Sequence, residues 1–307
     1  MTNYQEPFTF QSGVTVKNRL IMPPMTTLQS FYDGTITNDE INYYAERSHG
    51  VGAVITGAAN VTDMGKGWAG ELSIAHDDDL PGLTKLASAI QAQGAKAFVQ
   101  IFHAGRMSRS DALNGQQALC ASAVAGQHRD GSPKTATPRT MTLNEIHETI
   151  AAFGQATKRA IEAGFDGVEL HGANLYLLQQ FYSPHSNRRT DEYGGTREKR
   201  FTFIKQVLDS VFAAVDQYAD RPFVVGYRFS PEEFTTPGIN LDDTFYLVDQ
   251  LLQRPLDYLH VSLDKFDRVS RTKAYQEKSI MAYLHERIAG RKPLIGVGGV
   301  RTRSDVE

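Results

Sequence analysis

The sequence predicts an α/β fold of the (β/α)8 TIM-barrel class. Short apolar runs alternate with helical patterns at a spacing of about 30 residues or more, as is typical of successive βα units. The polar residues of chemical interest follow these apolar runs, and such a barrel forms its active site at the carboxyl ends of its strands. With 307 residues, 41% of them hydrophobic, the chain is long enough for a single domain over residues 1–307.

Each element is predicted from its own pattern. Seven strands are expected, at Arg19–Met22, Ala53–Thr56, Lys96–Gln100, Gly167–His171, Phe223–Arg228, Tyr258–Ser262 and Pro293–Val297. Six helices are expected, at Asp39–Gly50, Leu80–Gln93, Leu143–Ala163, Arg197–Tyr218, Asp242–Gln253 and Gln276–Ala289. Asp79 before Pro81 and Thr142 before Glu145 mark two helix starts.

Composition excludes several classes of function. The net charge of −3 gives no reason to expect nucleic acid or an anionic membrane as partner. The single cysteine, Cys120, excludes an intrachain disulfide framework and any cluster held by several thiolates. The N-terminus carries no basic apolar leader, and no apolar run reaches the length of a membrane span, so a cytoplasmic location is expected. Oligomeric state is left open.

Residues 166 to 177 outline a reaction site. They read Asp-Gly-Val-Glu-Leu-His-Gly-Ala-Asn-Leu-Tyr-Leu, an apolar strand that leads into His171, Asn174 and Tyr176. His171 and Asn174 offer two N–H donors for one carbonyl oxygen, where negative charge grows when hydride adds to a conjugated carbon. The Tyr176 phenol is a candidate general acid. A structural reading stays open, in which His171 caps the next helix and Tyr176 fills the core.

The same segment resembles the old yellow enzyme family of flavin-dependent ene-reductases (NADH:flavin oxidoreductases). His171-Gly-Ala-Asn-Leu-Tyr-Leu is followed by Phe181-Tyr-Ser-Pro-His-Ser-Asn187 and Arg189-Thr-Asp-Glu-Tyr-Gly-Gly195, as in that family. Further similar stretches occur in the expected order along the chain: Lys17-Asn-Arg-Leu-Ile-Met-Pro-Pro-Met-Thr26, Gln100-Ile-Phe-His-Ala-Gly-Arg106, Ala163-Gly-Phe-Asp-Gly-Val-Glu-Leu-His171 and Gly296-Val-Gly-Gly-Val300. The resemblance spans essentially the whole chain and implies FMN as cofactor, with NADH or NADPH as electron donor. Because the chain has one cysteine, the single-domain form of the family, without an iron–sulfur cluster, is expected.

The resemblance also implies flavin contacts. It places Thr26 at the flavin C4 carbonyl, and it brings Pro24, Met25 and Gly57 near the ring by their backbone. Without the resemblance, Thr26 is an ordinary turn residue. Gln100 ends an apolar strand, where an amide can donate to and accept from the flavin's pyrimidine ring.

Arg228 stands out on physical grounds. It lies in the apolar strand Val224-Val-Gly-Tyr-Arg-Phe, where a guanidinium is costly unless an anion meets it. The resemblance places the matching arginine at the N1 side of the flavin, where it stabilises the reduced cofactor. The alternative is a purely structural pair with Glu169, which shares strand parity with His171.

Gly296-Val-Gly-Gly-Val follows the seventh strand, where this barrel often forms a phosphate site. Gly298 and Gly299 are the candidate residues. Arg301 stands where a third glycine of a dinucleotide fingerprint would lie, so a Rossmann motif is excluded. The glycines also suit a simple strand-to-helix turn. No paired metal-ligand spacing occurs, so no catalytic metal is expected.

Two stretches depart from a plain barrel. Residues 105–139, rich in Gly, Ser, Gln and Thr, are expected to form a lid or small hairpin beside the pocket. The sequence reaches Glu307 in the first turn of the seventh helix, with the eighth βα unit missing, so we expect an incomplete chain. Were Glu307 the natural end, two unpaired barrel edges and weak flavin binding would follow.

The expected function is FMN-dependent reduction of the C=C bond of α,β-unsaturated carbonyl compounds by NADH or NADPH. His171 and Asn174 would hold the carbonyl oxygen, hydride would come from flavin N5, and Tyr176 would protonate the α-carbon. Two alternatives stay open: a flavin-free phosphate-binding barrel that acts as an isomerase or lyase, and a noncatalytic ligand-binding barrel.

Overall fold

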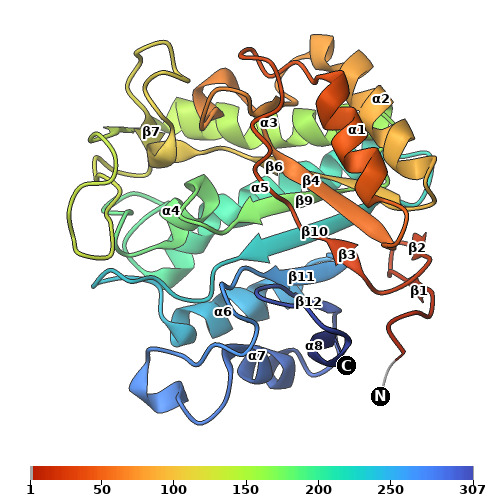
Figure 1. Ribbon diagram of the computed structural model, residues 1–307. Coiled ribbons are helices and arrows are strands. Elements are labelled where there is room, and N and C mark those ends of the chain that lie inside the picture. Colours follow the sequence, from red (N-terminus) through yellow and green to blue (C-terminus); the bar gives the residue numbers. More distant parts are fainter. Residues whose placement is uncertain (1–2, 307) are drawn as a thin grey trace.

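A computed structural model describes residues 3–306 (Figure 1). At its centre lies a curled parallel sheet whose strands pair in the order β12-β11-β10-β9-β6-β4-β3. The strands are β3 (Ile21–Met22), β4 (Ala53–Asn60), β6 (Lys96–Phe102), β9 (Gly167–Gly172), β10 (Val224–Phe229), β11 (Tyr258–Val261) and β12 (Leu294–Gly296). All seven expected strands are confirmed, and each predicted end lies within four residues of the observed one. The order follows the sequence, as it does in a βα barrel.

Helices cover the outer face of the sheet (Figure 1). They are α1 (Asn38–Arg47), α2 (Leu80–Gln91), α3 (Leu143–Glu162), α5 (Arg197–Tyr218), α6 (Leu241–Leu252) and α7 (Ile280–Ile288). All six expected helices are confirmed, and the predicted bounds of α5 match the structure. The barrel-class α/β fold is therefore confirmed.

One of the two predicted helix starts is right in full. Thr142 and Glu145 form a reciprocal capping box at the start of α3. Asp79 precedes α2 but makes no capping bond to that helix. Its carboxylate accepts instead from the Ser73 hydroxyl and the His76 N–H, because a 3₁₀ turn over Asp77–Asp79 comes before α2.

Several short elements escape the sequence patterns. They are the β1 (Phe8–Thr9) and β2 (Thr15–Val16) hairpin, β5 (Leu72–Ser73), α4 (Leu177–Tyr182), α8 (Arg303–Val306), and 3₁₀ turns at Asp63–Gly65, Gly105–Met107 and Lys273–Tyr275. α4 matters most, because it follows β9 directly and carries the polar motif into a buried helix.

Residues 105–139 form an excursion closed at its base. β7 (Leu119–Cys120) pairs with β8 (Arg139–Thr140), and Gln127 bridges Pro133 in antiparallel fashion near the tip. A hairpin-like tip therefore projects from a tied base, beside the carboxyl ends of the strands (Figure 1).

Within the described residues, β3 and β12 are the end strands of the sheet. A cavity of about 570 Å³ lies between them and includes Asp305 and Val306 of α8 in its lining. No helix in residues 3–306 combines the length and apolar character needed to cross a membrane.

Candidate active site

Parallel pairing brings polar side chains together in the barrel interior. Four residues lie side by side across neighbouring strands. Gln100 on β6 is paired with Glu169 on β9, Glu169 with Gly226 on β10, and Gly226 with Tyr258 on β11. The Glu169 carboxylate accepts from Gln100 Nε2 at 2.7 Å and from the Tyr258 hydroxyl at 3.0 Å, and it contacts His260 Nδ1 at 2.8 Å. Gly226 is required here, because a Cβ would lie 2.0 Å from the Tyr258 ring.

This carboxylate fixes the orientation of a candidate cofactor ligand. Burial raises the pKa of Glu169, but His260 and the other donors outweigh it, and the net pKa lies below the ordinary value. An ionised carboxylate accepts only, so the Gln100 amide must turn its Nε2 toward it. Gln100 therefore presents its Oε1 and one remaining N–H on the other side. The sequence did not predict that Glu169 orients Gln100, although it did show that Glu169 shares strand parity with His171.

Arg228 lies two residues beyond Gly226, in register with both His171 and His260. It is 7% exposed, its Nη2 donates to Ser262 Oγ at 3.2 Å, and its buried Nε has no partner among the described residues. Burial lowers the pKa of Arg228, and Glu169 opposes that shift. Arg228 and Glu169 attract each other electrostatically, but within residues 3–306 they make no direct ion pair of the kind that the structural alternative supposes. The guanidinium keeps an unused donor in a polar interior.

His171 is held as a neutral donor. Burial, followed by the charges of Arg228 and His260, lowers the pKa of His171 well below its ordinary value. Its Nδ1 accepts from the Ala173 N–H at 3.3 Å, which leaves the ring proton on Nε2. The alternative reading of His171 as a helix cap is therefore not supported, since α4 begins six residues later and its N-cap residue is Tyr176.

Asn174 is held as a second donor. Its Oδ1 accepts from Ser262 Oγ at 2.8 Å, and its backbone N–H donates to Ser230 Oγ at 2.9 Å. With the oxygen occupied, Nδ2 is the free end of the amide. Ser262 thus links Arg228 to Asn174 and selects which way the amide faces.

The backbone at this turn is strained. Asn174 and Leu175 both have positive φ, at 56° and 66°, a conformation that costs of the order of 1–3 kcal/mol for each non-glycine residue. The Leu175 N–H donates to Gln179 Oε1 at 2.9 Å, and Gln180 Nε2 donates to the Leu175 carbonyl. Two buried glutamines of α4 therefore hold the turn in place.

Gln180 also ties this turn to the loop after β6. Its Nε2 donates to the Ala104 carbonyl at 3.0 Å, and its Oε1 accepts from the Arg106 N–H at 3.1 Å. Gly105 has φ of 61°, and a Cβ there would lie 2.1 Å from Gln180 Oε1. Sequence reasoning missed Gln179 and Gln180, although two amides within the apolar Leu-Leu-Gln-Gln-Phe-Tyr helix were the available signal.

Tyr176 completes the cluster. Its ring packs edge-to-face on His171 and Phe102, with centroid distances of 4.8 and 5.0 Å, and lies 6.3 Å from Trp68. Burial, with a smaller effect from Glu71, raises the pKa of Tyr176 to about 12. The phenol therefore keeps its proton at neutral pH.

The turn after β3 crosses a bulge in β4. Thr56 and Gly57 lie where the pairing of β4 with β6 shifts. A Cβ on Gly57 would lie 2.7 Å from the Met25 carbonyl, so only glycine lets the turn after β3 pass this close to β4. Pro24 is buried there, whereas Met25 and Thr26 are exposed. The Gly57 N–H donates to the Tyr44 hydroxyl at 2.6 Å, which commits that donor.

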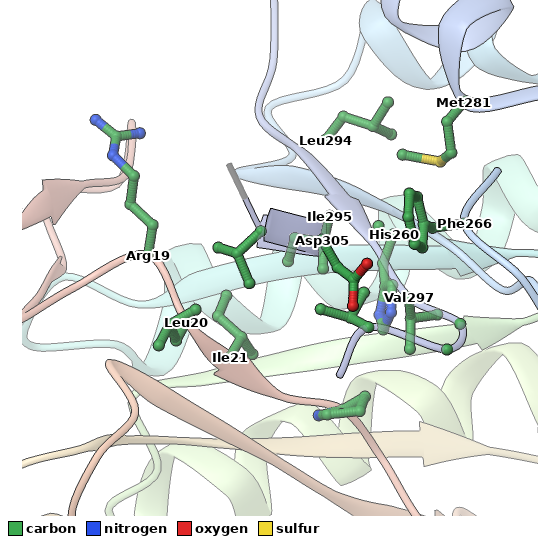
Figure 2. A pocket seen from close by; sticks show the side chains of 16 residues that line it. Arg19, Leu20, Ile21, His260, Phe266, Met281, Leu294, Ile295, Val297 and Asp305 are labelled. Carbon is green, nitrogen blue, oxygen red and sulfur yellow. The ribbon is translucent and has the colours of Figure 1, made fainter. Parts of the chain in front are cut away.

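Gly298 and Gly299 lie apart from Gln100 and line the cavity between β3 and β12. Figure 2 shows Leu20 and Ile21 on one side of this cavity and Ile295, Val297 and His260 on the other. Both glycines have positive φ, and a Cβ on Gly298 would lie 2.7 Å from the Leu263 carbonyl. The buried Nε2 of His260 has no partner within the described residues.

These features fit a flavin. Arg228 Nε and His260 Nε2 are unpartnered buried nitrogens on adjacent strands, and Gln100 presents an oriented amide. In the described part of the chain, no three His, Cys, Asp or Glu side chains are grouped in a way that could hold a metal.

Residues 5–307 match the NADH:flavin oxidoreductase / NADH oxidase family. The chain belongs to this family. The expected resemblance is confirmed, and this membership supports FMN as cofactor and a reduced nicotinamide as electron donor.

Relatives of this family member include the probable NADH-dependent flavin oxidoreductase YqiG of Bacillus subtilis, 48% identical over 98% of this chain and 79% of that protein. The NADH:acrylate oxidoreductase of Vibrio harveyi is 47% identical over 100% of this chain, which spans 30% of its length. The solved old yellow enzyme homologue from Zymomonas mobilis superposes with a TM-score of 0.80 at 27% identity, over 96% of this chain and 82% of that one.

Proposed function

We propose that this chain reduces the C=C bond of α,β-unsaturated carbonyl compounds. Bound FMN would supply hydride transfer, from a reduced nicotinamide to the flavin and from the flavin to the carbon acceptor. The observation that carries the proposal is the pair of donors at the end of β9. His171 Nδ1 and Asn174 Oδ1 are both occupied by internal donors, so each side chain offers only N–H outward.

These two donors suit one carbonyl oxygen. His171 is neutral, so it donates from Nε2 and does not bring a fixed positive charge. Asn174 donates from Nδ2, and its conformation is set before any ligand arrives. Donors fixed in this way stabilise the negative charge that develops on the oxygen when hydride reaches the conjugated carbon.

Tyr176 would deliver the proton to the α-carbon. Its pKa of about 12 keeps the phenol protonated, and its ring is fixed against the His171 imidazole. A positioned acid of this kind contributes about 10²–10⁴-fold to a rate.

For the cofactor, we propose contacts from two groups of residues. Gln100 and Arg228 would meet the pyrimidine side of the flavin ring, and Gly298 and Gly299 its phosphate. Pro24, Met25, Thr26 and Gly57 would meet the ring edge. The oriented Gln100 amide and the unpartnered Arg228 Nε support this assignment. We also propose that residues 105–139 act as a lid.

The first test separates the two half-reactions. The visible spectrum of the desalted protein, with and without added FMN, reports flavin binding, and stopped-flow absorbance reports reduction by NADH and reoxidation by 2-cyclohexenone. We expect Tyr176→Phe to slow reoxidation by about 10²–10⁴-fold and to spare reduction. His171→Ala with Asn174→Ala should abolish the charge-transfer band of a bound phenol. Unchanged reoxidation and unchanged phenol binding would reject these roles.

The acrylate named for the Vibrio harveyi relative is not assigned here. This chain spans 30% of that protein, so the site that acts on acrylate there need not lie in the matching part. A colourless protein that retains no added FMN would instead favour the alternative of a flavin-free phosphate-binding barrel.

A further inference from the structure

A cationic cluster lies at the mouth of the barrel. Arg129 at the tip of the 105–139 excursion and Arg271 in the loop after β11 both place their guanidinium groups over the ring of Phe234, which belongs to the loop after β10. The Cζ atoms lie 4.1 and 3.2 Å from the ring centroid, and Phe234 is 45% exposed. Three separate loops therefore meet through one aromatic ring.

Neither guanidinium is in direct contact with a carboxylate in the part of the chain that the structure describes. In residues 3–306, the Arg129 and Arg271 side chains make no ion pair with a carboxylate. Burial, followed by the charges of Arg268 and Arg129, lowers the pKa of Arg271, and the weaker attraction of Glu232 and Asp264 opposes this shift. Like charges held this close are unfavourable unless an anion joins them.

The nearby carboxylates are committed elsewhere. Glu232 accepts from the Ser270 hydroxyl and the Arg271 backbone N–H, and it contacts Arg268 at 3.5 Å. Glu233 accepts from Gln179 Nε2 at 2.8 Å, from the Ser183 hydroxyl and from a backbone N–H. These bonds fix the loop after β10 and leave the cluster positive.

A cavity of about 200 Å³ opens beside Arg129. Arg106, Arg129 and Lys134 line it against the single carboxylate of Glu233. Arg106 is 2% exposed; its Nη1 donates to the Val124 and Ala125 carbonyls, and its buried Nε has no partner within residues 3–306. Leu175, the neighbour of both Asn174 and Tyr176, also lines this cavity, so the cationic site adjoins the candidate active site.

We propose that this cavity binds the pyrophosphate of the nicotinamide dinucleotide donor. Guanidinium groups bind phosphate oxygens through paired N–H donors, and the Arg129 guanidinium packs against the Phe234 ring. The cavity is large enough for phosphate groups and small for a whole dinucleotide, which places the nicotinamide toward Leu175. The inference rests on the proposed function for its electron donor. A carboxylate on the acceptor is the other source of the same anionic chemistry.

The experiment compares two donors by stopped-flow flavin reduction. NADH carries the pyrophosphate, whereas 1-benzyl-1,4-dihydronicotinamide carries no phosphate. We expect Arg129→Gln and Lys134→Gln each to raise the apparent Kd for NADH by about tenfold, because a hydrogen bond between charged groups is lost. The limiting rate with NADH and all constants for the neutral donor should not change.

Arg109→Gln is the matched control. Arg109 lies on the same excursion, but its guanidinium is paired with Asp111 at 3.0 Å and it does not line this cavity. This variant should leave both donors unaffected. Calorimetric titration with inorganic pyrophosphate gives a second readout, with binding to the wild type that weakens about tenfold in Arg129→Gln.

Three results would overturn the assignment. Equal changes for both donors would mean that Arg129 acts only on the fold of the excursion. An unchanged Kd for NADH, with weaker binding of a carboxylate-bearing acceptor but not of 2-cyclohexenone, would assign the site to the acceptor. Absence of pyrophosphate binding to the wild type would remove the site.

If neither donor reduces the wild-type flavin, the proposed function fails. The pyrophosphate titration then still tests whether the cavity binds phosphate groups.

Discussion

The interior of the barrel and its rim differ in how their polar and charged side chains are paired. In the interior, Glu169 gathers Gln100, Tyr258 and His260, and most buried polar atoms there have a partner. At the rim, Arg129 and Arg271 share one exposed ring. The hydrogen bonds of the interior order its side chains before any ligand arrives, whereas the two guanidinium groups of the rim are not in direct contact with a carboxylate of the described residues.

This difference predicts where substitutions act. A change in the interior should alter folding and cofactor retention together, because the same bonds serve both. A change at the rim should alter ligand affinity and leave stability nearly constant. Asn174 lies between the two regions, exposed yet fixed by Ser262 and Ser230.

The largest effect is expected at Glu169. Glu169→Ala removes the shared acceptor of Gln100, Tyr258 and His260, so we expect a loss of about 3–5 kcal/mol in the free energy of unfolding. FMN retention should fall as well, because Gln100 is no longer oriented. Urea unfolding and flavin fluorescence measure the two effects. Glu169→Gln keeps the side-chain volume, so its free energy of unfolding and its FMN retention should lie between those of the wild type and of Glu169→Ala. Glu148→Ala, on the exposed face of α3, is the control. Stability lost with full flavin affinity would separate the two roles that the structure joins.

A smaller effect is expected from acid. Burial lowers the pKa of His103 to about 3, whereas an unfolded histidine titrates near 6.5. Between these values the unfolded chain binds the extra proton, so stability is complete above about pH 6.5 and falls by about 1.4 kcal/mol per pH unit below it. His103→Asn, which keeps an acceptor for the Gly105 N–H, should remove this part of the slope. The same slope in His103→Asn as in the wild type would contradict the interior assignment, and exposed His285→Gln is the comparison.

The smallest effect is expected at the boundary. Ser262→Ala frees the Asn174 amide from its donor, at a cost of about 1 kcal/mol, or fivefold in affinity. A phenol titration that follows the charge-transfer band measures this change, and Ser88→Ala on exposed α2 is its control. Undiminished phenol affinity would mean that the backbone alone orients Asn174.

The interior was more predictable than the rim. Strand parity placed Glu169 inside the barrel, and the cost of a buried charge singled out Arg228. Tyr258 and His260 alternate along their own strand in the same way, but in an apolar strand they resemble core residues. Only the register of the paired strands shows that both reach Glu169. The rim depends on loops from distant parts of the chain, and no spacing rule brings Arg129 to Phe234. α4 was missed because its six residues are all buried and show no polar face.

The strained turn at Asn174 and Leu175 has a consequence for protein engineering. Its shape depends on the amides of Gln179 and Gln180, and Gln180 also depends on Gly105 having no side chain. Residues 171–180 and 103–106 are therefore one transferable part. A graft of the His-Gly-Ala-Asn motif into another barrel should fail without the second segment.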